Sequence, residues 1–178
     1  MNTNDPFDLL LDLEKRTLKG TAGMPAVDLV EEEWVGVGFR IGDSRLIASM
    51  AEVKEILDLP SFTLVPGVKS WVVGVANVRG SLLPIMDMKT FLMGEDIRQR
   101  QKGRVIVIDY KGFNTGLIVE EVYGMRHFRE SDATDDVPAV HDGITPYVGK
   151  AFKQDDECWP VFDFSEMAQD ERFAHASL

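Results

Sequence analysis

The residues that could carry acid–base or metal chemistry are few and scattered along the chain. The three histidines are His127, His141 and His175, and none has the His-x-x-x-His or Glu-x-x-His spacing of a metal site. His141 and Asp142 are adjacent, but neighbouring residues of an extended chain point to opposite faces, which disfavours an acid–base pair. We therefore expect no catalytic residue, no metal and no cofactor.

Motifs for phosphate binding and covalent catalysis are also missing. Gly36-Val37-Gly38 only begins a dinucleotide-binding motif, lacks the third glycine and lies within a strand-like pattern. Cys158 is the one cysteine, so it can form neither an internal disulfide nor a cysteine-based metal cluster. Its position beside Trp159 predicts a small apolar core residue.

An acidic enzyme built on a β-barrel is the alternative function class. Asp87 and Asp163 each follow a strand-like segment and precede a helical one, so we interpret both as helix N-caps. Glu120 and Glu121 follow another strand and are expected to be exposed. An enzyme would need a buried carboxylate with a raised pKa inside a cleft, and the sequence marks none.

Composition limits the possible partners. The chain has 178 residues, of which 44% are hydrophobic, and a formal net charge of −11. This length suits one sizeable domain or two small lobes sharing a core. The acidity disfavours nucleic acid and anionic membranes, and no aromatic residues alternate with Lys and Arg as in a barrel that binds nucleic acid. Without a secretory signal or an apolar run of roughly 20 residues, a cytoplasmic protein with no direct membrane insertion is expected.

Most of the chain reads as short strands joined by turns, which is typical of small barrels or a sandwich. Period-two alternation or β-rich composition predicts strands at residues 34–41, 45–49, 73–78, 81–86, 104–110, 114–119 and 159–162. Residues 5–19 instead predict an amphipathic helix within an N-terminal extension and linker, 1–33. Residues 169–178 are assigned to a C-terminal tail.

An internal repeat predicts two similar lobes. Residues 83–88 and 159–164 both read apolar-Pro-apolar-apolar-Asp-apolar, and the strand-turn-strand units at 34–49 and 104–119 also resemble one another. We expect one continuous core shared by the two lobes. Its predicted members are Val37, Phe39, Val75, Leu83, Ile85, Val107, Ile118 and Phe162.

The most informative stretch, residues 71–92, reads as a strand, a tight turn and a second strand. Gly74 permits a close backbone approach or an unusual φ, and Asn77 can bond the backbone of its own turn. Gly80 supplies a positive φ, while Pro84 must lie at an edge or bulge because it donates no ladder bond. Arg79 has no evident part in folding and is predicted to be displayed at the hairpin tip.

This stretch resembles the Gly-x-x-Asn-x-Arg-Gly…Pro-x-x-Asp signature of the CheW coupling proteins of bacterial chemosensory systems. The similarity extends over residues 34–168. The N-terminal helix and the Trp-Val-Gly-Val-Gly-Phe opening resemble the PilI branch, which belongs to type IV pilus systems. The resemblance implies a mainly β fold of two five-stranded SH3-like barrels on a common apolar core.

The resemblance also implies a non-catalytic adaptor, recruited from the cytoplasm to membrane-associated receptor arrays. It would couple the cytoplasmic tip of a methyl-accepting chemoreceptor to the regulatory domain of a CheA-type histidine kinase, in type IV pilus (twitching) signalling. A flagellar chemotaxis coupling protein of the same family is the alternative. Motif matching places Val53, Glu55, Gly74, Arg79 and Val122 at a receptor groove between the lobes, and Asn77 and Gly80 complete the predicted partner-binding set.

Overall fold

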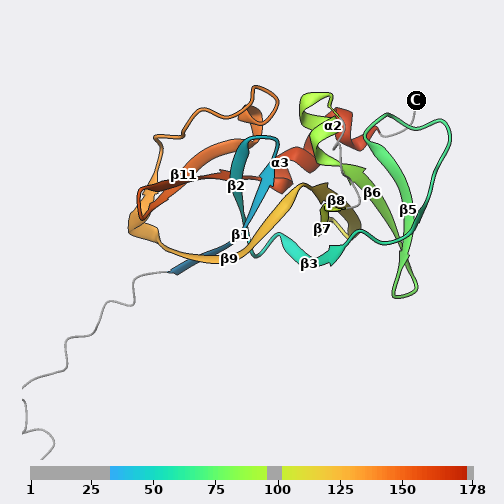
Figure 1. Cartoon of the computed structure of the whole chain (residues 1–178), viewed down its shortest axis with the longest axis horizontal. Helices are drawn as coiled ribbons and strands as arrows, with labels where there is room; N and C mark the ends of the chain where they lie inside the picture. Colours follow the sequence, from blue (N-terminus) through green and yellow to red (C-terminus); the bar gives the residue numbers. More distant parts are fainter. Residues whose placement is uncertain (1–32, 96–101, 176–178) are drawn as a thin grey trace, which may run out of the picture. The chain divides into compact units, whose positions relative to one another are not determined.

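The computed structural model describes residues 33–95 and 102–175, which form two six-stranded sheets (Figure 1). We call them lobe A, with strand order β10-β11-β12-β2-β1-β9, and lobe B, with strand order β3-β7-β8-β6-β5-β4. The mainly β fold is thus confirmed. The predicted helix at residues 5–19 lies outside the described residues and stays a prediction.

The strands of lobe A are β1 (Glu33–Ile41), β2 (Ser44–Ser49), β9 (Glu121–Arg129), β10 (Ala133–Thr134), β11 (Val148–Gln154) and β12 (Glu157–Phe162). Those of lobe B are β3 (Val53–Asp58), β4 (Phe62–Thr63), β5 (Val72–Val78), β6 (Ser81–Asp87), β7 (Arg104–Tyr110) and β8 (Phe113–Val119). The helices are α2 (Met88–Met93), α3 (Phe164–Gln169), α4 (Glu171–Ala174) and the 3₁₀ turns η2 (Glu130–Asp132) and η3 (Thr145–Tyr147). Five strands per lobe were expected, and the two-residue edge strands β4 and β10 bring each sheet to six.

The two lobes share one topology, and the chain crosses between them twice. The hairpin β1–β2 belongs to lobe A, and the chain then enters lobe B at β3; the hairpin β7–β8 belongs to lobe B, and the chain then enters lobe A at β9. Each lobe also contains one parallel pair, β12 with β2 and β6 with β8. Each half of the chain therefore supplies a hairpin to one lobe and four strands to the other.

The repeated apolar-Pro-apolar-apolar-Asp unit has the same role in both lobes. Pro84 in β6 and Pro160 in β12 each come directly before the residue at which parallel pairing starts, so neither needs an N–H for that ladder. Asp87 caps α2 and Asp163 caps α3, each accepting a backbone N–H of the first helical turn, at 3.0 and 2.9 Å. Both predicted N-caps are thus confirmed, although Asp87 is fully buried.

The apolar interior is divided into clusters, where one continuous core was expected. The division follows strand alternation, because successive side chains of a strand point to opposite faces. In β7, Val105 and Val107 fill the interior of lobe B, whereas Ile106 and Ile108 belong to a shared cluster with residues from both lobes. A third cluster, around Trp159, fills lobe A.

The predicted core residues separate accordingly, and one of them is wrong. Val37, Phe39 and Phe162 lie in the shared cluster. Leu83, Ile85, Val107 and Ile118 lie in the cluster of lobe B. Val75 is only half-buried, because its neighbours Gly74 and Ala76 occupy the inner positions around a bulge in β5.

The segment expected to be a tail contributes to the shared cluster. Phe173 of α4 is buried and packs edge-to-face against Phe91 of α2, with ring centroids 5.4 Å apart. The Tyr147 hydroxyl donates to Asp170 at 2.5 Å and accepts from Arg172 at 2.8 Å. The ring contact attaches α4 to α2, the helix that follows β6 of lobe B, and the hydrogen bonds attach it to η3.

Candidate functional site

The turn between β5 and β6 presents an arginine on a conformation that few residues adopt. Arg79 and Gly80 both have positive φ, 51° and 85°, as a two-residue type I′ hairpin turn requires. The side-chain oxygen of Asn77 accepts the Gly80 N–H at 3.0 Å, which confirms the predicted bond within the turn. The hairpin therefore holds the Arg79 backbone firmly while 79% of its side chain stays exposed.

Arg79 has a partner that the sequence analysis did not foresee. Its Nη1 lies 3.1 Å from Oε2 of Glu55 in β3, whose side chain is 26% exposed. Within the sheet, β7 and β8 separate β3 from β6, so this ion pair connects parts of lobe B that are not neighbouring strands. Arg79 is displayed at the hairpin tip, as predicted, and it is also in direct contact with Glu55, a second predicted site residue.

A shallow hollow of about 210 Å³ lies beside this ion pair, and its lining adds residues that were not predicted. Leu82 lines it and is 75% exposed, because the alternation of β6 directs Leu83 inward. Lys54 also lines the hollow and donates to Asn114 at 2.9 Å. The sequence did carry a signal for the exposure of Leu82. Leu82 and Leu83 are consecutive in a strand, so their side chains point to opposite faces and only one of them can be buried. The hollow thus combines one large apolar side chain with paired charges.

Val53 and Gly74, also predicted site residues, are buried. Val53 is 6% exposed and packs in the shared cluster. A Cβ on Gly74 would lie 2.3 Å from the carbonyl oxygen of Thr63, so Gly74 allows the close backbone approach that was predicted. Neither residue can offer a side chain to a partner, and both instead hold the strands that carry Glu55 and Arg79.

Val122 lies in a separate groove. It is half-buried on β9 and lines a space of about 500 Å³ together with residues of β3, β7 and the segments beside them. The lining residues are Ile56, Lys102, Arg104, Glu120, Glu121, Val122 and Gly124. Glu55 lines the hollow beside Arg79, whereas its neighbour Ile56 lines this groove, so β3 lies between the two.

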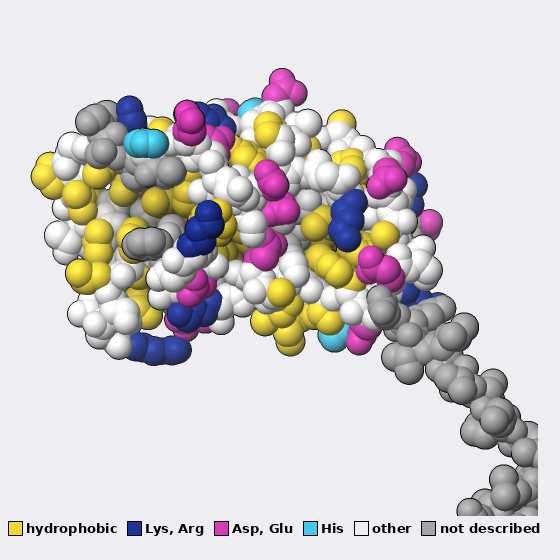
Figure 2. All heavy atoms as spheres, turned by 180° about the vertical axis from the view of Figure 1, so that it is seen from behind, with side chains coloured by type: hydrophobic (Ala, Val, Ile, Leu, Met, Phe, Trp, Pro, Cys, Tyr) yellow, Lys and Arg dark blue, Asp and Glu magenta, His cyan; other side chains and the backbone are white. Residues whose placement is uncertain are grey.

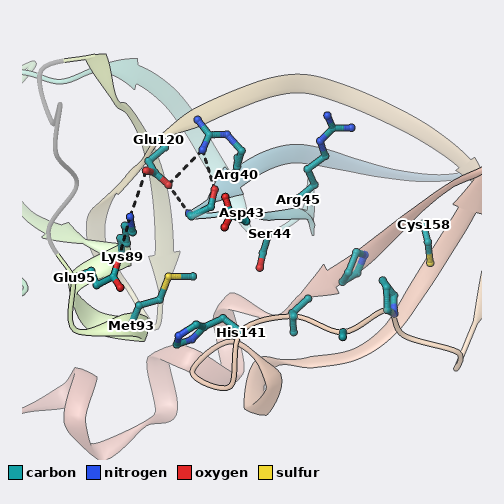
Figure 3. Close-up of a pocket in the computed structure, with 15 residues that line it drawn as sticks. Arg40, Asp43, Ser44, Arg45, Lys89, Met93, Glu95, Glu120, His141 and Cys158 are labelled. Carbon is teal, nitrogen blue, oxygen red and sulfur yellow. Dashed lines mark hydrogen bonds and ion pairs between the residues drawn. The ribbon is translucent and has the colours of Figure 1, made fainter.

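A further hollow, of about 650 Å³, has Glu120 in its lining (Figure 3). Oxygens of Glu120 lie 3.6 Å from Arg40 and 3.8 Å from Lys89, and one of them accepts the backbone N–H of Gly42. Glu120 was expected to be exposed, but only 18% of its side chain is accessible. The reason is its place at the crossing from β8 to β9, where the β1–β2 turn and α2 both meet it.

Arg45 and His141, which also line this hollow, each have a partner within the fold. Arg45 pairs with Glu157 at 2.9 Å, and Nδ1 of His141 accepts the backbone N–H of Gly143 at 3.1 Å. Cys158 is half-buried and lines the hollow, whereas the next residue of β12, Trp159, is buried. The assignment of Cys158 to the core is therefore wrong. Burial raises the pKa of its thiol, which favours the protonated, unreactive form.

Across residues 33–95 and 102–175, no three His, Cys, Asp or Glu side chains are grouped so as to hold a metal ion. None of the helices described is long and apolar enough to cross a lipid bilayer.

Comparisons with known proteins agree with this geometry. Residues 35–172 match the CheW-like domain family. The chain is 41% identical to the protein PilI of Pseudomonas aeruginosa over 97% of each chain, and 26% identical to the chemotaxis protein CheW of Bacillus subtilis over 70% of this chain and 80% of that one. The scaffolding protein CheW of Thermoanaerobacter tengcongensis shares the fold, with a TM-score of 0.67, 22% identity and coverage of 79% of this chain and 96% of that one. The chain therefore belongs to the CheW-like domain family, within its PilI-like branch.

Proposed function

We propose that this protein is a non-catalytic adaptor that couples a methyl-accepting chemosensory receptor to a CheA-type histidine kinase in type IV pilus signalling. One surface binds the cytoplasmic tip of the receptor, and the regulatory domain of the kinase binds the same adaptor. The protein is thereby recruited from the cytoplasm to membrane-associated receptor arrays. The pilus assignment rests on the similarity to PilI, which covers 97% of both chains.

The observation that carries this proposal is the arrangement at the β5–β6 hairpin. Arg79 stands on a turn of fixed conformation, is 79% exposed and has the carboxylate of Glu55 beside it. Exposed arginines next to apolar side chains are common at the centres of protein interfaces, because the guanidinium offers five donors in a rigid plane. Leu82, 75% exposed, is the apolar neighbour.

Titration of the full-length protein with two purified fragments tests the coupling. One fragment is the cytoplasmic hairpin tip of a receptor from the host bacterium, and the other is the regulatory domain of its CheA-type kinase. We expect each fragment to bind alone, and a ternary complex to form when both are present. If the protein bound neither fragment, or if the two competed for one site, coupling would be excluded.

The flagellar alternative is separated by a motility measurement. The 26% identity to the Bacillus subtilis CheW covers only 70% of this chain, whereas the 41% identity to PilI covers 97% of it. Deleting the gene in its host should therefore reduce twitching on surfaces and leave swimming chemotaxis in soft agar unchanged. The opposite result would assign the protein to flagellar chemotaxis.

A further inference from the structure

Two hairpin turns of lobe B, β5–β6 and β7–β8, are built alike. In each turn a side-chain oxygen, of Asn77 or of Asp109, accepts the N–H of the glycine three residues later at 3.0 Å. The residue before that glycine is Arg79 in the first turn and Lys111 in the second, with φ of 51° and 52°. Each turn therefore holds a cationic residue in the left-handed conformation at its tip. We call Arg79 and Lys111 the cationic tips.

The two turns lie at the same end of lobe B. The strands β6 and β8 are parallel neighbours, and each begins directly after its turn, at Ser81 and at residue 113. The hollow of about 210 Å³ is lined by Arg79 from the first hairpin and by Asn114 from the second. Seen from behind, Lys and Arg side chains lie at the lower end of lobe B, near the tip of the β5–β6 hairpin (Figure 2). One partner could therefore contact both hairpins.

The cationic tips differ in how their charges are paired. Arg79 lies 3.1 Å from Glu55, whereas Lys111 forms no ion pair with any carboxylate in the described part of the chain. The Nζ of Lys111 lies instead 4.9 Å from the centre of the Tyr110 ring, and the side chain is exposed. The chain has 30 Asp and Glu against 19 Lys and Arg, so carboxylates are plentiful. Lys111 is therefore left with a charge that a carboxylate from outside could neutralise.

Lobe A provides a comparison within the same chain. Because the lobes share one topology, the β11–β12 turn corresponds to the β5–β6 turn, and the β1–β2 turn corresponds to the β7–β8 turn. The β11–β12 turn has Asp155 and Asp156 at its tip, with φ of 49° and 64°, and Asp43 lies in the β1–β2 turn. Such turns thus form with acidic residues at the tip, so the fold itself does not require the cations of lobe B.

We propose that Lys111 is a second partner-binding residue beside Arg79, and that the two cationic tips together bind carboxylates on the receptor tip. This inference rests on the proposed function and deepens it. The occupant is the partner of Arg79, because the hairpins that carry the two tips line one hollow. Lysine is a compact point charge, whereas arginine is a planar fork that matches a carboxylate in one orientation. Arg79 therefore fixes the orientation, and Lys111 selects receptors with a second acidic residue in reach.

The first test removes the charge of Lys111 without straining its turn. Asparagine tolerates a positive φ, so Lys111→Asn should fold normally and keep the wild-type melting temperature. Titration of the full-length protein with the receptor-tip fragment should show about threefold weaker binding at about 50 mM salt, as for an exposed charge at an interface rim. At about 500 mM salt the variant and the wild type should bind equally, because salt screens the contact.

The matched control is an exposed lysine of the other lobe. Lys153 in β11 pairs with Asp136 at 3.1 Å, and its side chain is 55% exposed. Lys153→Gln removes the same charge from the protein, so it changes the net charge as Lys111→Asn does. We expect it to bind the receptor tip as the wild type does at both salt concentrations. An equal loss for both variants would show that only the net charge matters, which would overturn the inference.

A charge series at position 111 shows whether the charge itself acts. Lys111→Arg should bind like the wild type. Lys111→Asp should bind about tenfold more weakly at low salt, chiefly through a slower association rate, which stopped-flow mixing measures. The turns with Asp155 and Asp156 indicate that aspartate is compatible with this conformation. If Lys111→Arg bound as weakly as Lys111→Asn, the charge of Lys111 would not be what the partner recognises.

The outcomes separate this inference from the proposed function. If Arg79→Ala weakens receptor binding while every variant at Lys111 binds like the wild type, only this inference fails. If the wild type does not bind the receptor tip at all, the proposed function fails. A loss for Lys111→Asn that is confined to the kinase fragment would assign this end of lobe B to the kinase and would also overturn the inference.

Discussion

Arg79 and Glu55 form an ion pair of 3.1 Å that joins the β5–β6 hairpin tip to β3, with the arginine 79% exposed and the glutamate 26% exposed. Ion pairs this accessible contribute about 0–1 kcal/mol to stability, because water screens them and two long side chains lose freedom. The pair is therefore better suited to orienting the guanidinium than to holding lobe B together.

Replacing Arg79 by alanine should separate binding from folding. We expect Arg79→Ala to change the free energy of unfolding by no more than about 0.5 kcal/mol, as for other surface substitutions. The same change should weaken binding to the receptor tip by about 2 kcal/mol, or about thirtyfold. Chemical denaturation of the variant and titration with the receptor-tip fragment measure the two effects.

Two further variants show how the arginine acts. Arg79→Lys should recover only part of the affinity, because lysine keeps the charge but lacks the planar set of donors. Glu55→Gln should weaken binding less than Arg79→Ala if the glutamate only orients its partner. A loss of several kcal/mol in stability for Arg79→Ala would show that the arginine is structural, and normal binding would remove it from the site.

Gly74 is predicted to matter for folding and not for direct contact. A Cβ at this position would lie 2.3 Å from a backbone oxygen, so Gly74→Ala should lower the free energy of unfolding by about 2 kcal/mol or more. Gly149→Ala is the matched control, since a Cβ there meets nothing within 4 Å. Thermal melts followed by circular dichroism should show a clear shift for the first variant and almost none for the second. Equal melting temperatures would contradict the steric argument.

Glu52 should make stability depend on pH in one direction. Its side chain accepts hydrogen bonds from the backbone N–H and hydroxyl of Ser165, at 3.0 and 3.1 Å, while burial raises its pKa above the usual 4.5. A carboxyl whose folded-state pKa is raised contributes stability below its unfolded pKa, and this contribution is lost as the pH rises through the folded value. Ionised Glu52 is therefore less favourable in the fold than the neutral acid.

Glu52→Gln tests this directly, because glutamine keeps an acceptor oxygen without the charge. Relative to the wild type, we expect its melting temperature to be higher at pH 8 than at pH 4, where wild-type Glu52 is largely protonated. Glu52→Ala removes the acceptor and should be less stable at both values. A glutamine variant whose relative stability falls as the pH rises would show that the Ser165 bonds require the carboxylate.

The Tyr147–Asp170–Arg172 group should show the opposite pH dependence. Hydrogen bonds from Arg172 hold the pKa of Asp170 well below its usual 3.8, and burial together with Asp170 raises the pKa of Tyr147 to about 12. A depressed pKa contributes stability above the unfolded value, and this is lost as the pH falls through the folded one. Asp170→Asn should therefore lower the melting temperature more at pH 7 than at pH 2.5. An equal loss at both values would mean that the charge of Asp170 contributes nothing.

The sequence predicted the elements whose signals are local. The β1–β2 and β7–β8 hairpins alternate clearly because one face of each strand is buried, and the aspartate caps depend only on the residues that follow them. The strand β9 was missed entirely. It is an edge strand with Gly124 at positive φ, a bulge and several charged residues, so its alternation is interrupted.

The site could be predicted only in part for a related reason. Asn77, Arg79 and Gly80 form one turn, so their mutual arrangement follows from adjacent residues. The contact of Arg79 with Glu55 and the burial of Val53 depend on how distant strands meet, which residue spacing cannot specify. The family motif predicts that these residues belong to one site. It does not predict which of their side chains face solvent, as Arg79 does, and which are buried, as Val53 is.

The two crossings between the lobes have a consequence for synthesis of the chain. Every strand of lobe B lies in the continuous stretch 53–119, whereas lobe A combines strands within 33–49 with strands within 121–162. On the ribosome, lobe B can close as soon as its last strand emerges. The β1–β2 hairpin must wait, with both of its edges unpaired, until β9 and β12 are made. Unpaired strand edges in incomplete chains promote aggregation, so the first strands synthesised are among the last to be protected.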